Sequence, residues 1–351
     1  MKKFLMVCLV LVFAVSMVAG CAPAEEPAEP VEEPADDVAS DEPVVEEEPL
    51  KAALLTSGPI NDGGWNTKAY EGLLLLEEEF GYEIGYTENV KQDEQVMIAQ
   101  EYARKGYDLV IGHGYEFGDS LAVVAPDFPD VYFVNVGGTS GGAAPNLASG
   151  VFENGVLGYL AGRLGAELTE TNRIGFVGAM EIPTVINEVT AMIAAAEYYN
   201  PDIKVSVTYT GSWVDVAAGK EAALAMIADD YDYIVAIGDA ANTGVIQAAD
   251  EKGIWAVGWA GDMHDLAPDR VATSFVQSVS AVIEYFALNI ENGTWVGEAL
   301  EFGVPEATQF VGTWADGVPQ EIKDNIMADF AKFESGEYSK SIVEEMTGIS
   351  E

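Results

Sequence analysis

The sequence predicts an α/β fold of two lobes, each a doubly wound parallel sheet with helices on both faces. Short runs rich in aliphatic and aromatic residues alternate with segments whose apolar residues recur at helical spacing, a pattern typical of parallel sheets. About 300 residues follow an acidic N-terminal segment, which is too long for one small core and suits two lobes. The order of the strands places the change from the first sheet to the second near 152–154.

In the first half of the chain, the predicted strands are short and are followed closely by glycine or asparagine, as strands bounded by turns are. They are 52–56, 84–87, 109–112 and 132–136. The segments that alternate with them have the helical period. The helices predicted from these segments are 65–80, 94–105, 120–128 and 156–168.

The second half of the chain repeats this alternation. Its predicted strands are 174–177, 205–209, 233–237, 255–259 and 272–276. Its predicted helices are 184–199, 216–228, 243–252 and 279–292. Neither half contains an internal repeat or a heptad pattern long enough for a coiled coil.

The first residues, 1–21, are predicted to be a lipoprotein signal peptide. Two lysines precede an apolar run, 4–18, that is too short to span a bilayer comfortably and ends in small residues. The Val-Ala-Gly-Cys motif ending at Cys21 resembles the bacterial lipobox, in which the cysteine is acylated. The chain's other cysteine, Cys8, lies inside the signal, so the mature protein would have no disulfide. An ordinary signal peptide that contains a cysteine is the alternative interpretation.

The segment 22–49 is predicted to be a disordered, self-repelling tether. It consists almost wholly of Ala, Pro, Glu, Asp and Val and has no basic residue, so it buries too little surface to offset its ordering entropy. The whole chain carries 16 Lys and Arg against 59 Asp and Glu, a formal net charge of −43. Because such an acidic surface repels phosphates, nucleic acids and nucleotides are not expected as partners.

The loops that follow the predicted strands are the candidate ligand site, because ligands of open α/β sheets bind outside the carboxyl ends of the strands. The loops 57–66, 112–119, 178–184, 210–215, 238–243 and 258–265 contain no Lys or Arg. They are instead rich in aromatic rings and carboxylates. The residues are Trp65, Tyr115, Phe117, Trp213 and Trp259, with Asp62, Glu116, Asp119, Glu181, Asp215, Asp239 and Asp262.

A site of aromatic walls and carboxylates without a cation is a poor host for a phosphate or carboxylate ligand. It fits a planar neutral ligand with N–H or O–H donors, such as a nucleobase, or an amine in an aromatic cage. Simpler interpretations remain open for some residues. Asp119, Asp215 and Asp239 precede helices and could act only as N-caps, and Trp259 could belong to the core.

The motifs of an enzyme are missing from the sequence. The two histidines, His113 and His264, lie far apart in the sequence, and no HExxH motif or cysteine cluster offers metal ligands. No GxSxG elbow, Walker loop or GxGxxG motif follows a predicted strand. The sequence therefore predicts a binding protein with no catalytic residue, metal or cofactor.

From about Lys51 to its end, the chain resembles the basic membrane protein family of lipoproteins, the purine-nucleoside-type substrate-binding proteins of ABC transporters. The resemblance implies a type I periplasmic-binding-protein fold with a hinge, three crossovers and a ligand cleft. Lobe 1 would be 50–153 rejoined by 274–303, and lobe 2 would be 154–273 rejoined by 304–351. The motifs that carry it are NDGGWNTKAYEG (61–72), YDLVIGHGYEFGDSL (107–121), FPDVYFV (128–134), GYLAGRLGAELTETNRIGFVGAMEIP (158–183), TYTGSWVDVAAGKEAA (208–223) and GVIQAADEKGIWAVGW (244–259).

The resemblance implies roles for individual loop residues. The family's aromatic residue in an Asp-x-x-aromatic-Asn turn falls on Trp65, with Asp62 and Asn66 at its polar edge. The second base-stacking aromatic residue, in a Gly-x-aromatic-x-Asp loop, falls on Trp213. The family's acidic residue after the third strand falls on Asp119.

The chain departs from the nucleoside-binding members where they contact the sugar. Their Gly-Val-Asp-x-Asp-Gln-like loop reads Gly-Trp-Ala-Gly-Asp-Met at 258–263, which keeps Asp262 but has Ala260 in place of the first Asp. Their lysine after the next strand is replaced by Gln277. Since Trp259 would also reduce the space for ribose, a free purine base is as strong a candidate as a nucleoside.

The sequence thus predicts a lipid-anchored solute-binding protein on the extracytoplasmic face of the cell membrane. It would deliver a purine base or nucleoside to an ABC permease and its ATPase. The alternatives are a receptor for a flavin-like heterocycle or a caged amine, and a signalling receptor of the same fold. The predicted ligand-binding residues are Asp62, Trp65, Asn66, Tyr115, Phe117, Asp119, Glu181, Trp213, Asp239, Trp259 and Asp262.

Overall fold

A computed structural model describes residues 48–339, 342 and 345. The expected signal peptide, Cys21 and nearly all of the expected tether therefore lie outside the described residues. Within the part of the chain that is described, none of the helices combines the length and the apolar character needed to cross a bilayer.

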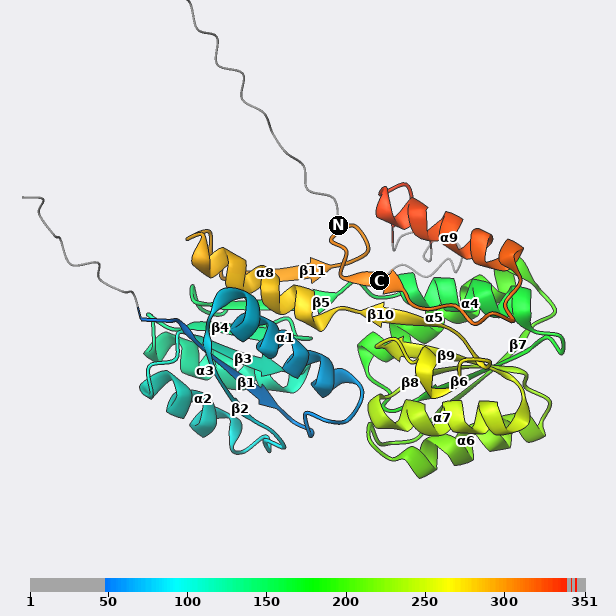
Figure 1. Ribbon diagram of the computed structural model, residues 1–351, viewed down its shortest axis with the longest axis horizontal. Coiled ribbons are helices and arrows are strands. Elements are labelled where there is room, and N and C mark those ends of the chain that lie inside the picture. Colours follow the sequence, from blue (N-terminus) through cyan, green and yellow to red (C-terminus); the bar gives the residue numbers. More distant parts are fainter. Residues whose placement is uncertain (1–47, 340–341, 343–344, 346–351) are drawn as a thin grey trace, which may run out of the picture. The chain divides into compact units, whose positions relative to one another are not determined.

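The first sheet has the strand order β11-β5-β4-β3-β1-β2, and all of its neighbouring strands are parallel (Figure 1). Successive residues of β1 point to opposite faces, as the pleat requires. Leu54 packs with helices α1 and α8, whereas Leu55 packs with α2 and α3. The elements are β1 (Lys51–Thr56), α1 (Trp65–Phe80), β2 (Glu83–Thr87), α2 (Gln95–Arg104), β3 (Leu109–His113), α3 (Gly118–Val124), β4 (Tyr132–Val136), β5 (Leu147–Phe152), α8 (Val279–Glu291) and β11 (Ala299–Phe302).

The second sheet has the order β12-β10-β9-β8-β6-β7, with β12 antiparallel to β10 and the other pairs parallel. Helices α4, α5 and α9 cover one face, and α6 and α7 cover the other (Figure 1). The elements are α4 (Val156–Leu168), β6 (Arg173–Gly178), α5 (Pro183–Tyr199), β7 (Lys204–Tyr209), α6 (Val216–Ala228), β8 (Tyr233–Ile237), α7 (Asp239–Lys252), β9 (Trp255–Ala260), β10 (Val271–Gln277), β12 (Gln309–Val311) and α9 (Gln320–Glu334).

The chain passes between the two sheets three times, after β5, β10 and β11. Hydrogen bonds join these crossovers to one another. The backbone N–H of Glu153 donates to Phe302 O at 2.7 Å, the side-chain amide of Gln309 donates to Glu153 O at 2.8 Å, and the N–H of Ser278 donates to Thr308 O at 2.6 Å. The three connections therefore form one hydrogen-bonded group.

The structure adds elements that the sequence analysis did not predict: β5, β11, β12 and α9. The strand β5 reads LASGVF, and its Ser-Gly pair interrupts the pattern of a buried strand. Helix α7 begins at Asp239, four residues before the predicted start at 243. Its first turn has only small and polar side chains, a composition that is also typical of a loop. Strand β10 stays in the second sheet to Gln277, three residues beyond the expected return at 274.

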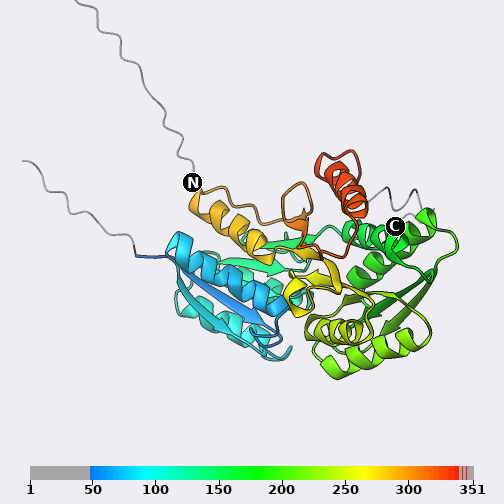
Figure 2. The same cartoon turned by 45° about the vertical axis from the view of Figure 1, so that its right-hand side comes forward.

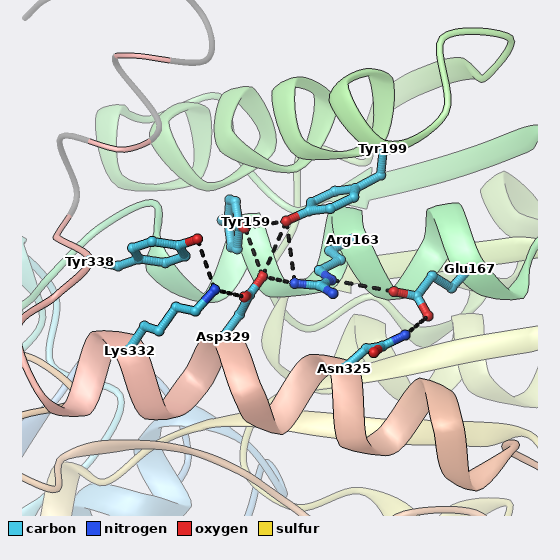
Figure 3. Close-up of polar contacts among 8 residues, drawn as sticks. All are labelled: Tyr159, Arg163, Glu167, Tyr199, Asn325, Asp329, Lys332 and Tyr338. Carbon is cyan, nitrogen blue, oxygen red and sulfur yellow. Dashed lines mark hydrogen bonds and ion pairs between the residues drawn. The ribbon is translucent and has the colours of Figure 1, made fainter.

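Helix α9 lies along α4 in both ribbon views (Figures 1 and 2), although some 150 residues separate them in the sequence. A polar network at the centre of this contact joins the two helices (Figure 3). Asp329 of α9, only 1% exposed, accepts hydrogen bonds from Tyr159 at 2.8 Å and Tyr199 at 3.2 Å. It also pairs with Arg163 and with Lys332. This carboxylate therefore ties the C-terminal helix to the second lobe.

Candidate ligand-binding site

The order of the strands reverses once in each sheet, between β1 and β3 in the first and between β6 and β8 in the second. Connections leave such a switch point on opposite faces of the sheet, which opens a crevice at the carboxyl ends of the strands. One cavity of about 170 Å³ lies there, and it is lined from both sheets. Residues that follow the four strands supply Trp65, Tyr115, Ile182 and Asp239 to its wall.

The cavity gathers about half of the residues predicted from the sequence. Those that line it are Trp65, Asn66, Tyr115, Trp213, Asp239 and Trp259, together with Ala260 and Gln277, where the chain departs from the nucleoside-binding pattern. The other predicted residues lie outside its lining: Asp62, Phe117, Asp119, Glu181 and Asp262.

Asp62 supports the cavity from behind, through the N-terminus of α1. Its carboxylate accepts hydrogen bonds from the backbone N–H groups of Gly64, Asn66 and Thr67 at 2.9–3.2 Å. It also accepts one from the side-chain amide of Asn66 at 2.8 Å. This last bond fixes the orientation of the Asn66 amide, so Asp62 positions a lining residue.

The remaining four predicted residues have other surroundings. Phe117 is fully buried and packs in the core with residues of β3 and α3. Asp119 and Glu181 are exposed, at the starts of α3 and α5. Asp262 accepts hydrogen bonds from the hydroxyl and N–H groups of Thr313 at 2.6 and 2.9 Å, which tie the loop after β9 to the segment after β12.

Trp65 forms an aromatic wall that is held from behind. The imidazole of His113 stacks on it with ring centroids 4.4 Å apart, and Phe152 meets it edge-on at 5.9 Å. Burial lowers the pKa of His113 to about 3, so its neutral ring donates through Nε2 to the carbonyl of Trp65 at 3.0 Å. Gly137 is needed beside them, since its φ is +83° and a Cβ there would lie 2.9 Å from the indole.

The other aromatic lining residues contribute differently. Trp259 is 4% exposed and packs edge-to-face on Phe275, so it belongs to the core of the second lobe as well as to the cavity wall. Trp213 is partly buried in the loop before α6. Tyr115 is 62% exposed and therefore lies at the rim.

Three buried acceptors in the cavity wall have no hydrogen-bond partner: Asn66 Oδ1, Glu188 Oε1 and Asn242 Oδ1. A buried polar atom without a partner costs about 1–3 kcal/mol, so a ligand that donates to these oxygens relieves that cost. Glu188 could not be predicted from the loops, because it lies inside helix α5. Asn242 falls in the candidate loop 238–243 but is neither aromatic nor a carboxylate, the two residue types that marked the site. The position of Glu188 could be recognised only from the packing of α5.

The cavity is less negative than its sequence suggests. Burial, followed by the nearby charges of Asp62 and Glu116, raises the pKa of Asp239 to about 8. Burial also raises the pKa of Glu188 to about 7, although backbone N–H groups of Gly158 and Gly155 oppose the shift. At neutral pH, Asp239 is therefore mostly a neutral acid that can donate as well as accept.

None of the lining residues is Lys or Arg, so an anionic ligand finds no counter-charge in the wall. Among residues 48–339, 342 and 345, no group of three or more His, Cys, Asp or Glu side chains could hold a metal ion. The arrangement is suited to holding a planar, neutral molecule that presents hydrogen-bond donors.

Comparison with known proteins places this geometry in a family. The model of the PnrA-like ABC transporter substrate-binding proteins matches residues 50–344. The transcriptional activator protein med of Bacillus subtilis is 31% identical over 277 residues, covering 79% of this chain and 86% of the relative. A purine-binding protein of Brucella abortus is 28% identical, with 83% of each chain covered. A putative ABC transporter glucose-binding protein of Haloferax volcanii is 26% identical, with 81% of this chain and 72% of the relative covered.

A solved structure confirms the predicted fold class. The ABC transporter solute-binding protein of Conexibacter woesei superposes with a TM-score of 0.70 at 25% identity, and the match covers 83% of this chain and 98% of that one. The family consists of substrate-binding proteins and not of enzymes, which confirms the prediction of a binding protein. The chain belongs to the PnrA-like family of substrate-binding proteins of ABC transporters.

Proposed function

We propose that the solute bound by this protein is a purine, and that the free base binds at least as well as the nucleoside. The observation that carries this proposal is the combination of aromatic walls at Trp65 and Trp213 with three unpartnered acceptors in a cavity without a cation. A purine offers a flat π-face to the walls and N–H donors to the acceptors. The lobes would close around the purine, and the permease would recognise the closed protein.

The relatives' names support a small neutral solute but differ about which one. The Brucella relative is named as purine-binding, and the Haloferax relative as putatively glucose-binding. A sugar also carries donors, but it lacks the flat π-face that two tryptophans from different sheets can stack on. The chemistry of the cavity therefore favours the purine.

Calorimetry with the purified protein tests this proposal. Adenine, guanine, D-glucose, riboflavin and choline would be titrated in turn, and mass spectrometry would identify any small molecule that co-purifies. Binding of a purine in the micromolar range or tighter is expected. The proposal is contradicted if neither purine binds at about 1 mM, or if glucose, riboflavin or choline binds more tightly than both.

The preference between base and nucleoside is a separate prediction. Ala260 and Gln277 lie in the lining where the family's nucleoside-binding pattern has charged residues. These two positions therefore offer no charge-assisted hydrogen bond to ribose hydroxyls. The double change Ala260→Asp with Gln277→Lys is expected to shift the adenosine-to-adenine affinity ratio toward adenosine. Ala260 has a φ of +66°, a conformation that aspartate adopts more readily than alanine, so the change adds no backbone strain.

The measurement is a pair of titrations, adenine and adenosine, on both proteins. The matched control is Gln277→Lys alone, which adds the positive charge without its partner. A preference of the unsubstituted protein for adenosine by more than about tenfold, or roughly 1.4 kcal/mol, would show that other residues hold the sugar.

We also propose that Cys21 carries a lipid that anchors the protein to the membrane. The lipobox at the end of the predicted signal peptide supports this. Cys21→Ser is expected to leave an unprocessed precursor that cannot be labelled with a radioactive fatty acid, whereas Cys8→Ser should be labelled normally. Fatty-acid labelling of the Cys21→Ser protein would refute the anchor.

A further inference from the structure

Glu188 is a carboxylate built into the buried wall of the cavity. Its side chain belongs to α5 and is only 3% exposed. One oxygen, Oε2, accepts a hydrogen bond from the N–H of Gly158 at 2.7 Å, while the other, Oε1, is buried without a partner. The residue lines the cavity, and its unpartnered oxygen is buried beside the ligand space.

The packing of α4 against α5 fixes the position of this carboxylate. A Cβ at Gly158 would collide with the backbone oxygen of Glu188 and would lie 2.9 Å from Oε2, so only glycine allows the two helices to approach this closely. Two backbone N–H groups at the N-terminus of α4, from the N-cap residue Gly155 and from Gly158, favour the charged form of Glu188, as the positive end of a helix dipole does. Glu188 is therefore held by its backbone surroundings, with Oε2 fixed by the hydrogen bond from Gly158 N–H.

No cation balances this carboxylate. Lys and Arg side chains make ion pairs elsewhere among the described residues, but none of these pairs involves Glu188. The nearby carboxylate of Glu153 acts against its ionisation. A buried carboxylate without a cationic partner costs stability, and a donor from a ligand at Oε1 would relieve that cost.

We propose that Glu188 determines specificity, its Oε1 accepting a hydrogen bond from an exocyclic amino group of the ligand. This inference rests on the proposed binding of purines and adds which purines are preferred. An amino group at the buried end of the ring supplies the donor that Oε1 lacks. A ligand with hydrogen in its place leaves a buried acceptor unpaired, and such sites reject the analogue strongly.

The test compares adenine with the parent compound purine, which lacks only the amino group. It is made at about pH 8.5, where Glu188 with its pKa of about 7 is ionised and Oε1 can accept. The unsubstituted protein is expected to bind adenine at least about tenfold more tightly than purine. In Glu188→Gln, the amide oxygen can keep the bond from Gly158 N–H, which turns the amide nitrogen toward the ligand. A donor then faces a donor, so the adenine preference is expected to fall about tenfold or more. A purely structural role for Glu188 would weaken both ligands equally and leave their ratio unchanged.

Glu181→Gln is the matched control, because Glu181 is exposed near the start of the same helix and does not line the cavity. The ratio of its affinities for adenine and for purine should equal the ratio of the unsubstituted protein. If Glu188→Gln does not fold, Glu188→Asp replaces it, since the shorter side chain withdraws the carboxylate and should also lower the ratio.

The outcomes separate this inference from the proposed function. If the unsubstituted protein binds neither adenine nor purine at about 1 mM, both are overturned. If its affinities for adenine and for purine differ by less than about threefold, the role of Glu188 is overturned while purine binding stands. The same holds if the ratio of the two affinities is unchanged in the Glu188 variants.

Discussion

Asp329→Ala is expected to lower the free energy of unfolding by about 3–5 kcal/mol, because it removes the buried centre of the network between α4 and α9. Its carboxylate neutralises Arg163, whose side chain is only 13% exposed, and it accepts from two tyrosines (Figure 3). Burial raises the pKa of Tyr159, so that phenol stays protonated and needs an acceptor. Without Asp329, Arg163 keeps only the carboxylate of Glu167, and the hydroxyls of Tyr159 and Tyr199 keep only each other and the Arg163 guanidinium.

Urea denaturation followed by circular dichroism measures this loss. Asp324→Ala is the matched control, because Asp324 is exposed on the same helix and accepts only from Gln320 in the structure. The control should change the free energy of unfolding by no more than about 0.5 kcal/mol. Ligand affinity should be unchanged in both variants at temperatures where they are folded, since α9 does not line the cavity. A loss below about 1 kcal/mol for Asp329→Ala would show that Glu167 alone can satisfy Arg163.

The contrast between Trp65 and Asp329 shows what the sequence could predict. Trp65 follows a buried strand in a glycine-rich loop, and the rule that ligands bind at the carboxyl ends of parallel strands is enough to place it in a site. The partners of Asp329, in contrast, are set by tertiary packing. Tyr159 lies 170 residues away from it, and no local pattern links them.

The same distinction applies within the cavity. Trp213 and Asp239 could be assigned from their position shortly after a strand. Glu188 lines the cavity from inside helix α5, where a polar residue usually indicates a solvated face. For Phe117 the prediction was wrong in the other direction: its loop position indicated a ligand contact, but its ring is buried in the core. The direction of a side chain depends on helix rotation and packing, which composition does not encode.

Trp65→Ala is expected to weaken adenine binding by about 1–3 kcal/mol, the usual contribution of one aromatic ring stacked on a base. The indole lies between the cavity and His113, which holds it at a centroid distance of 4.4 Å. Alanine removes the stacking face and leaves His113 to relax into the space. Trp65→Phe should retain a smaller flat surface on His113 and lose less affinity.

Trp295→Ala is the control that separates binding from stability. Trp295 packs on Tyr132 and Phe286 and does not line the cavity, so its removal should lower stability and leave affinity unchanged. Adenine titrations by calorimetry would be made at a temperature where all three variants are folded. If Trp65→Ala binds adenine within about twofold of the unsubstituted protein, Trp65 does not stack on the ligand. The affinity would then come from Trp213 or from the acceptors of the cavity wall, and Trp213→Ala distinguishes the two: a loss of about 1–3 kcal/mol assigns the stacking to Trp213, whereas an unchanged affinity assigns the binding to the acceptors.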